Sequence, residues 1–279
     1  MTRRALVLGG GGITGIAWEW GILAGLAEAG IALSDADLVV GTSAGSVVGA
    51  QVANGLDPSA RYEAQLAPPD GELAGTFGTG TILRYGLAML AGSRAPRKVR
   101  QRIGRLALRV DGDASARVRV IDSRLPVKDW PSETALRITA VNAETGEFRV
   151  FDRESGVPLV HAVAASCAVP GVWPPVTIDG GRYMDGGARS ATNADVADGY
   201  DKVVLLAPIT RGIGPMPGAG AHVERLRRRS AVALVSPDPD ALRAFGRNVL
   251  DPAKRADAAR AGRRQAGAVA AAVRAVWSD

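Results

Sequence analysis

The chain has 279 residues, 47% of them hydrophobic and 35 of them glycine, a composition typical of a compact α/β protein with a sizeable core. Its single cysteine excludes a disulfide framework and a cysteine-based zinc site, and its two histidines disfavour a histidine-rich metal site. The net charge of +6 equals the excess carried by residues 221–279, which hold 12 basic and 6 acidic side chains.

We interpret this basic segment as the solvated face of helices, with contact to an anionic membrane surface as the alternative. Nucleic acid is not expected as a partner, because aromatic residues do not alternate with the arginines as base stacking would require. The N-terminal apolar run is too short for a signal peptide, and no later run reaches the roughly 18 apolar residues of a membrane span. We therefore expect a cytoplasmic protein with at most peripheral membrane contact.

Strands and helices alternate over the first 53 residues. Arg4–Leu8 and Asp37–Val40 are short apolar runs typical of buried strands, and the apolar segments Ile13–Ala29 and Val47–Ala53 are predicted to be helices. Each strand is followed by a glycine-containing turn and then by a helix. This order predicts a parallel sheet with helices on its faces.

The rest of the chain continues the mixture of strands and helices. Strands are expected at Leu136–Asn142, Phe148–Asp152, Val203–Ala207 and Val232–Val235, the first two forming a hairpin, with a loop at Ile209–Ala221. Residues 68–80 are rich in proline and glycine and are expected to form a loop. The apolar segment Thr81–Ser93 is expected to line an acyl pocket, form a lid or touch a membrane, or else to be a packing helix.

The four glycines that follow the first strand indicate an anion-binding turn. The pattern Gly10-x-Gly12-x-x-Gly15 between a strand and a helix matches the dinucleotide-binding fingerprint. That interpretation also requires an acidic residue at the end of the second strand, where this chain has Gly41 and Thr42. A nucleotide-binding module therefore lacks its ribose partner and remains only an alternative.

The second strand leads into Gly41-Thr42-Ser43-Ala44-Gly45, a G-x-S-x-G nucleophile elbow. A serine on so tight a strand-to-helix turn has strained dihedral angles, and only glycine at the two flanking positions lets the chain pass itself. The ends of parallel strands share one edge of the sheet, so the glycine-rich loop is expected to face Ser43. Its N–H groups would then stabilise the oxyanion of an acyl transfer reaction.

The serine needs a base, and two arrangements remain open. The order Ser43, Asp185, His222 fits a Ser-His-Asp hydrolase, but His222 lies between a Gly/Pro loop and a basic helix, with nothing apolar to fix its ring. A carboxylate acting directly on the serine is the other arrangement, and Asp185 before Gly186-Gly187 could approach the elbow closely, although D-G-G is also an ordinary turn. The remaining histidine, in "PLVHAVAAS", is expected to lie on a helix face.

Three motifs in this order resemble those of the patatin-like phospholipases: the glycine-rich "GGGGITG", the elbow "GTSAG" and the aspartate motif "DGG". The segment "AASCAVPGVWPPV" between the last two is also similar to the family's. The resemblance covers residues 4–206 and is weak beyond Pro208. It implies a three-layer α/β fold with a central, mostly parallel sheet flanked by helices. We expect one domain, residues 1–279, with a catalytic core at about 4–207 and a helical, basic section at about 222–279.

The resemblance implies a lipid acyl-ester hydrolase with a Ser–Asp dyad, an acyl-enzyme intermediate, and no metal or other cofactor. Ser43 would be the nucleophile and Asp185 the general base. The oxyanion N–H groups would come from the three glycines Gly10, Gly11 and Gly12. Gly41 and Gly45 would support the elbow, and Gly186 and Gly187 the aspartate motif.

Thr14 departs from the family pattern, because many members have an arginine at this position. Without this cation, binding of a phosphate headgroup is less expected. Hydrolysis of neutral lipids or other esters is favoured instead. The alternatives to a Ser–Asp hydrolase are a Ser-His-Asp esterase and a non-catalytic nucleotide- or lipid-binding module. The oligomeric state is not indicated by the sequence.

Overall fold

The computed structural model describes residues 2–68, 95–212 and 214–278. Its strands are β1 (Arg4–Leu8), β2 (Leu38–Gly41), β3 (Ala135–Asn142), β4 (Phe148–Phe151), β5 (Val176–Ile178), β6 (Gly181–Asp185), β7 (Lys202–Leu206) and β8 (Ala231–Val235). Its helices are α1 (Gly12–Glu28), α2 (Ala44–Ala53), α3 (Pro58–Leu66), α5 (Pro96–Ala107), α6 (Ser115–Arg124), α7 (Leu159–Ser166), α8 (Ala219–Leu226), α9 (Pro239–Phe245) and α10 (Arg255–Trp277). The short 3₁₀ helices used below are η3 (Gly186–Ala188) and η4 (Ala194–Ala197).

One mixed sheet forms the centre of the molecule, with the strand order β5-β6-β3-β2-β1-β7-β8 and β4 paired with β3. Five neighbouring strands are parallel to one another: β3, β2, β1, β7 and β8. Strands β4, β5 and β6 are antiparallel to the strands with which they pair. All four residues of β2 are buried, as expected for a parallel strand covered on both faces. The expected central, mostly parallel sheet is therefore confirmed.

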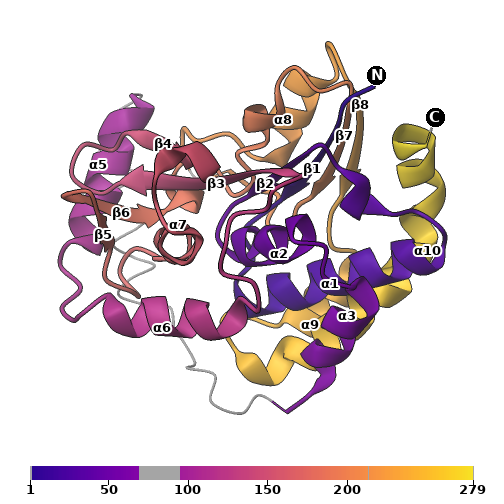
Figure 1. Ribbon diagram of the computed structural model, residues 1–279, viewed down its shortest axis with the longest axis horizontal. Coiled ribbons are helices and arrows are strands. Elements are labelled where there is room, and N and C mark those ends of the chain that lie inside the picture. The colour runs from indigo at the N-terminus through magenta and orange to yellow at the C-terminus, as the bar shows by residue number, and fades with distance from the viewer. Residues whose placement is uncertain (1, 69–94, 213, 279) are drawn as a thin grey trace.

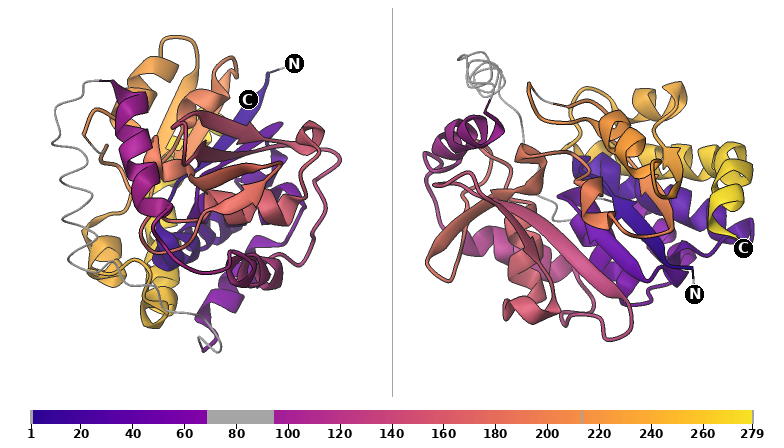
Figure 2. Two further views of the ribbon diagram at one scale, coloured as in Figure 1. Left: turned by 90° about the vertical axis from the view of Figure 1, so that its left-hand side faces the viewer. Right: turned by 90° about the horizontal axis from the view of Figure 1, so that it is seen from above.

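Helices cover both faces of the sheet and make it a three-layer structure (Figure 1). On one face, apolar side chains of β1 and β2 pack with α1, α2, α7 and α10 in the largest hydrophobic cluster. On the other face, the alternate side chains of the same strands pack with α8 and η4. Helix α5 covers β3 and β6 at the opposite end of the molecule from α10, as Figure 2 shows.

The basic C-terminal section packs on the protein through the contact between α10 and α1. Glycines let the two helix backbones approach closely: a Cβ on Gly21 would lie 2.2 Å from the Ala259 carbonyl oxygen, and one on Gly262 would lie 2.4 Å from the Trp18 carbonyl oxygen. The Trp18 indole donates a hydrogen bond to Gln265 across the contact, at 2.9 Å. This section is thus a structural cover for α1, with its arginines on the outside.

The expected strands are all present, and the differences concern short elements. Helix α2 begins at Ala44, directly after the elbow serine, rather than at Val47, because its first turn consists of small residues without an apolar pattern. Strand β5 has only three residues and was not expected. Helix α8 takes up the last residues of the expected loop, from Ala219 onward. The apolar segment Thr81–Ser93 lies outside the described residues.

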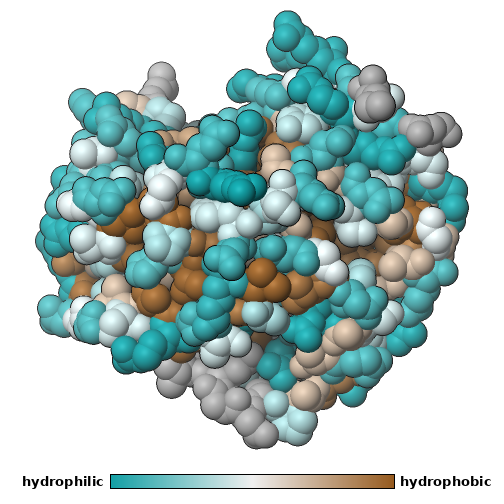
Figure 3. All heavy atoms as spheres, viewed as in Figure 1, coloured by the Kyte–Doolittle hydropathy of each residue, from teal (hydrophilic) through white to brown (hydrophobic). Residues whose placement is uncertain are grey.

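The surface combines hydrophilic rims with a hydrophobic band. Figure 3 shows this band of hydrophobic residues across the middle of one face, interrupted by hydrophilic ones. Within residues 2–68, 95–212 and 214–278, no helix is both long enough and apolar enough to cross a membrane.

Candidate active site

Ser43 occupies a strained turn between β2 and α2. Its backbone angles are φ 53° and ψ −118°, a conformation that side-chain-bearing residues rarely adopt. The flanking glycines have no room for a side chain: a Cβ on Gly41 would lie 2.5 Å from the Ser46 Cα, and one on Gly45 would lie 2.1 Å from the Leu8 carbonyl oxygen. The G-x-S-x-G spacing therefore has the steric cause inferred from the sequence.

The end of α7 holds both the elbow and the aspartate motif in place. The Ser166 hydroxyl accepts a hydrogen bond from the Ser43 N–H at 2.9 Å, and the Cys167 thiol lies 3.2 Å from the Ser43 carbonyl oxygen. Next along the chain, the Ala168 carbonyl oxygen accepts a hydrogen bond from the Asp185 N–H at 2.9 Å. This connection gives the "AASCAVP" segment a structural role.

The sheet brings Asp185 to the elbow through β3. Ile138 pairs with Gly41 at the end of β2, and Ala140 pairs with Asp185 at the end of β6. Ile138 and Ala140 also pair with β4, which occupies one edge of β3. Strands β2 and β6 therefore both lie along the other edge of β3. Because β2 is parallel and β6 antiparallel to β3, their carboxyl ends point at each other across Thr139.

Asp185 is a buried carboxylate in contact with the serine. It is 5% exposed, and its Oδ1 accepts a hydrogen bond from the Gly187 N–H at 2.7 Å. Burial raises the pKa of this carboxyl to about 6, and hydrogen bonds from Ser43 and Gly187 and the charge of Arg117 oppose the rise. A carboxyl with this pKa is ionised at neutral pH and is a stronger base than an exposed aspartate.

The glycines of the aspartate motif allow this close approach. A Cβ on Gly186 would lie 2.4 Å from the Thr139 hydroxyl oxygen, and one on Gly187 would lie 2.9 Å from Oδ1 of Asp185. A side chain at position 186 would push η3 away from β3, and one at position 187 would press against the Asp185 carboxylate. D-G-G is thus more than an ordinary turn here.

The glycine-rich loop passes beside Ser43 and differs from the expectation at Gly10. The Gly10 N–H donates to the Ala191 carbonyl oxygen at 2.7 Å, so it is not available to an oxyanion. Among the described residues, no acceptor is within hydrogen-bonding distance of the N–H of Gly11 or Gly12, which lie at the start of α1. The expectation for Gly10 is therefore wrong, because its N–H anchors the loop, while Gly11 and Gly12 remain candidates for oxyanion donors.

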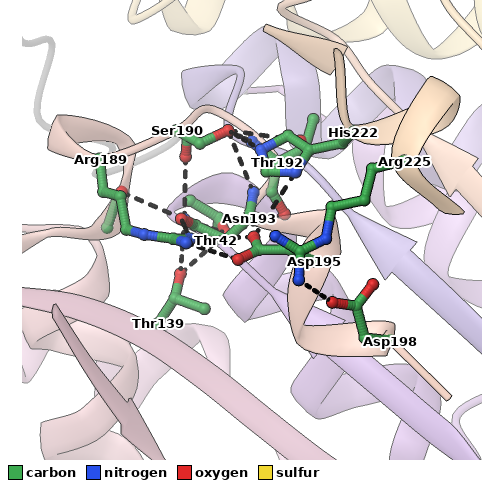
Figure 4. A network of polar contacts seen from close by, with 11 residues as sticks. Thr42, Thr139, Arg189, Ser190, Thr192, Asn193, Asp195, Asp198, His222 and Arg225 are labelled. Carbon is green, nitrogen blue, oxygen red and sulfur yellow. Dashed lines mark hydrogen bonds and ion pairs between the residues drawn. The ribbon is translucent and has the colours of Figure 1, made fainter. Parts of the chain in front are cut away.

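A buried polar network behind the elbow joins β2, β3 and the aspartate motif (Figure 4). At its centre, the Asn193 side-chain nitrogen lies 3.1 Å from the Thr42 hydroxyl, 3.2 Å from the Thr139 hydroxyl and 3.1 Å from the Gly186 carbonyl oxygen. The hydroxyls of Thr42 and Thr139 are 2.8 Å apart. Asn193 was not identified from the sequence. Its left-handed backbone conformation (φ 44°), which asparagine adopts more readily than most residues, is visible only in the structure.

His222 belongs to this network and not to the serine. Its Nε2 lies 3.0 Å from the Ser190 hydroxyl, and its Nδ1 lies 3.5 Å from the Asp195 carboxylate, as Figure 4 also shows. The ring is 4% exposed, so the expectation of an unfixed imidazole was wrong. Burial lowers the pKa of His222, and the Asp195 charge opposes this change. With both nitrogens engaged elsewhere, the Ser-His-Asp arrangement has no geometric support.

A small cleft opens at the serine, with a volume of about 30 Å³. Its lining includes Ser43, Gly12 at the start of α1, Arg117 and Trp173. Cys167, beneath Ser43, is buried, and burial raises the pKa of its thiol, which disfavours the nucleophilic thiolate. In the part of the chain that the structure describes, no group of three or more His, Cys, Asp or Glu side chains could hold a metal ion.

The family model described as "Patatin-like phospholipase" matches residues 6–198, more than half of the chain. The chain belongs to the patatin-like phospholipase family. Membership supports lipid hydrolysis as the activity of this patatin-like protein. The match begins inside β1 and ends after η4, so it contains the elbow, the aspartate motif and the loop between β1 and α1.

Solved structures similar to this patatin-like chain include VipD from Legionella pneumophila, with a TM-score of 0.48 and 14% identity over 98% of this chain and 67% of that one. ExoU, described as a type III effector protein, matches with a TM-score of 0.43 and 16% identity over 98% of this chain. ExoU in complex with SpcU from Pseudomonas aeruginosa matches with a TM-score of 0.42 and 17% identity. The chain spans 53% of the ExoU chain in both. No match was found among curated proteins.

Proposed function

We propose that this protein hydrolyses acyl esters of lipids with Ser43 as nucleophile and Asp185 as the general base. The observation that carries the proposal is the buried Asp185 carboxylate where β2 and β6 meet, close enough to Ser43 for the serine side chain to lower the pKa of this carboxyl. No imidazole is required, because burial gives Asp185 the raised basicity that a proton acceptor needs at neutral pH.

The reaction would proceed in two proton-balanced halves. Asp185 takes the Ser43 proton while Oγ attacks the ester carbonyl carbon; the oxyanion that forms accepts hydrogen bonds from the N–H groups of Gly11 and Gly12. The intermediate collapses, and the leaving alkoxide receives the proton from Asp185. In the second half, Asp185 takes a proton from water, the hydroxide attacks the acyl-enzyme, and Ser43 recovers its proton as the fatty acid leaves.

The start of α1 favours this oxyanion for a second reason. The helix has no acidic residue in its first turn, so the positive end of its dipole is not neutralised. Ser43 and Gly12, at this helix end, line the same cleft, and Ser43 is partly exposed while the residues on either side of it are buried.

The proposal is tested by labelling with an uncharged alkyl fluorophosphonate, which reacts with activated serines. Ser43→Ala and Asp185→Asn are expected to abolish labelling. The matched controls Ser123→Ala and Asp129→Asn, which change exposed residues, are expected to retain it. Loss of labelling in His222→Gln with the fold intact would support the Ser-His-Asp arrangement. An unlabelled but folded native protein would favour a non-catalytic lipid- or nucleotide-binding module.

A further inference from the structure

Arg117 is a cation that lines the cleft beside Ser43. It lies in the first half of α6, and the cleft that contains Ser43 and Gly12 is bordered by its side chain and by Trp173. Its charge lowers the pKa of both Asp185 and Cys167, so its field reaches the reacting groups. Any substrate bound at Ser43 will therefore experience this charge.

The guanidinium of Arg117 has unused hydrogen-bonding capacity. Among the described residues, its Nε is buried without a hydrogen-bond partner, and its one hydrogen bond is a long one from Nη2 to the Cys167 carbonyl oxygen, at 3.4 Å. Within the described residues, no carboxylate forms an ion pair with it. By contrast, the partly buried Arg189 forms an ion pair with Asp195. An unpaired, partly buried guanidinium is costly, and a bound anion would offset that cost.

Trp173 fixes the orientation of this guanidinium. The Arg117 Cζ lies 4.9 Å from the centre of the Trp173 ring. Contact with an aromatic face stabilises the cation and leaves the N–H edges of the planar group free. Those edges have the geometry that binds two oxygens of a phosphate at once.

The loop between β1 and α1 does not offer a cation of its own. Thr14, at the position where many patatin-like proteins have an arginine, is fully buried. Its hydroxyl lies 3.4 Å from the carbonyl oxygens of Gly11 and Val249. The first turn of α1 thus uses this position for packing, and a substrate anion must find its positive charge elsewhere in the cleft.

We propose that Arg117, oriented by Trp173, is the subsite that binds the phosphate of the substrate, so that acyl esters with a phosphate near the ester are preferred. This inference rests on the proposed function of Ser43. In a glycerophospholipid, the phosphate and an acyl ester are on adjacent carbons, and Arg117 and Ser43 line the same cleft. The cation lost at position 14 is replaced from α6, and the resulting preference is for phospholipids over neutral lipids.

The test compares two soluble short-chain substrates, dihexanoyl phosphatidylglycerol and dihexanoylglycerol, which differ in the phosphate-linked headgroup. Used as monomers, they remove any contribution from binding to a membrane surface. The native protein is expected to have a kcat/KM at least tenfold higher for the phospholipid. Arg117→Gln is expected to lower the ratio of the two values about 10- to 100-fold, as for loss of charge-assisted hydrogen bonds. Arg117→Lys should retain part of the ratio.

Arg119→Gln is the matched control, because Arg119 lies on the same helix, is exposed and lines a different cavity. It removes the same charge and is expected to leave kcat/KM unchanged for both substrates. Equal losses on the two substrates in Arg117→Gln, or no preference in the native protein, would overturn the phosphate subsite. Fluorophosphonate labelling that depends on Ser43 would show in the same preparation that the proposed function itself stands.

A measurement on the native protein avoids reliance on a variant that fails to fold. Glycerol 3-phosphate, the probe for the phosphate subsite, is expected to slow fluorophosphonate labelling of Ser43 at concentrations where glycerol has no effect. Equal effects of the two compounds would contradict the proposal.

Discussion

Gly41 and Asp185 end two strands that meet head to head along one edge of β3. Their partners, Ile138 and Ala140, are separated by Thr139 alone. The elbow at Ser43 begins where β2 stops, so the sheet register sets the distance between the serine and its carboxylate. A dyad built in this way depends on strand pairing, which makes it sensitive to changes in the sheet and the turns that carry it.

The first prediction concerns the pH dependence of the reaction. The base must be ionised to accept a proton, and the pKa of Asp185 is about 6. The rate of fluorophosphonate labelling, measured from pH 4.5 to 9, should rise to a plateau with a midpoint near 6. A rate that keeps rising tenfold per pH unit through pH 8 would show that a different group controls the serine.

A second prediction links this profile to Arg117. Its positive charge lowers the pKa of Asp185, so removing the charge in Arg117→Gln should move the midpoint to higher pH. Arg119→Gln, with the same loss of charge at an exposed site, should leave the midpoint where it is. A midpoint that shifts equally in both variants would indicate a general effect of net charge.

The third prediction is a pH-dependent gain of stability in Asp185→Asn. The folded pKa of about 6 exceeds the reference value of 3.8, so the unfolded chain ionises first, and the native state loses stability as the pH rises from about 4 to about 6, with no further loss at higher pH. The difference of about two pKa units corresponds to about 3 kcal/mol. Asp185→Asn should therefore be more stable than the native chain at pH 8 by up to about this amount, and the gain should vanish below pH 4. Urea unfolding at both pH values measures it.

The fourth prediction tests the steric basis of the elbow. An Ala at position 45 would place its Cβ 2.1 Å from the Leu8 carbonyl oxygen. Gly45→Ala should destabilise the fold by about 2 kcal/mol or more and greatly reduce labelling of Ser43. The control Gly267→Ala, in an exposed position of α10 with no atom within 4 Å of the new Cβ, should be neutral or stabilise by up to about 1 kcal/mol. Thermal unfolding measures the stability of both variants, and labelling rates measure the reactivity of Ser43 in each.

The fifth prediction concerns the network that joins the two strand ends. Thr139→Val keeps the shape of the side chain and removes the hydroxyl that contacts Thr42 and Asn193. Leaving these buried groups with fewer partners should cost about 1–3 kcal/mol of stability. It should also lower kcat more than it changes KM, because the positions of Ser43 and Asp185 loosen. Thr177→Val, on the exposed side of β5, should change neither quantity appreciably.

Features that depend on local chemistry were predictable from the sequence. The strained serine turn requires glycine at 41 and 45 whatever surrounds it, and the apolar runs of β1 and β2 identify buried strands. Resemblance to a family supplied the pairing of Ser43 with Asp185, which residue patterns alone left open between two arrangements. Strand β5 escaped prediction because three residues are too few to show a period.

Features that depend on how distant segments meet were decided only by the tertiary structure. The N–H of Gly10 is taken by Ala191, His222 is held by Ser190 and Asp195, and Arg117 lines the cleft at the serine. None of these contacts has a signature in the sequence, because each joins residues far apart in the chain through the strand order and the paths of the loops. The sequence by itself determined the strained serine turn, while the folded sheet decided which carboxylate, donors and cation surround it.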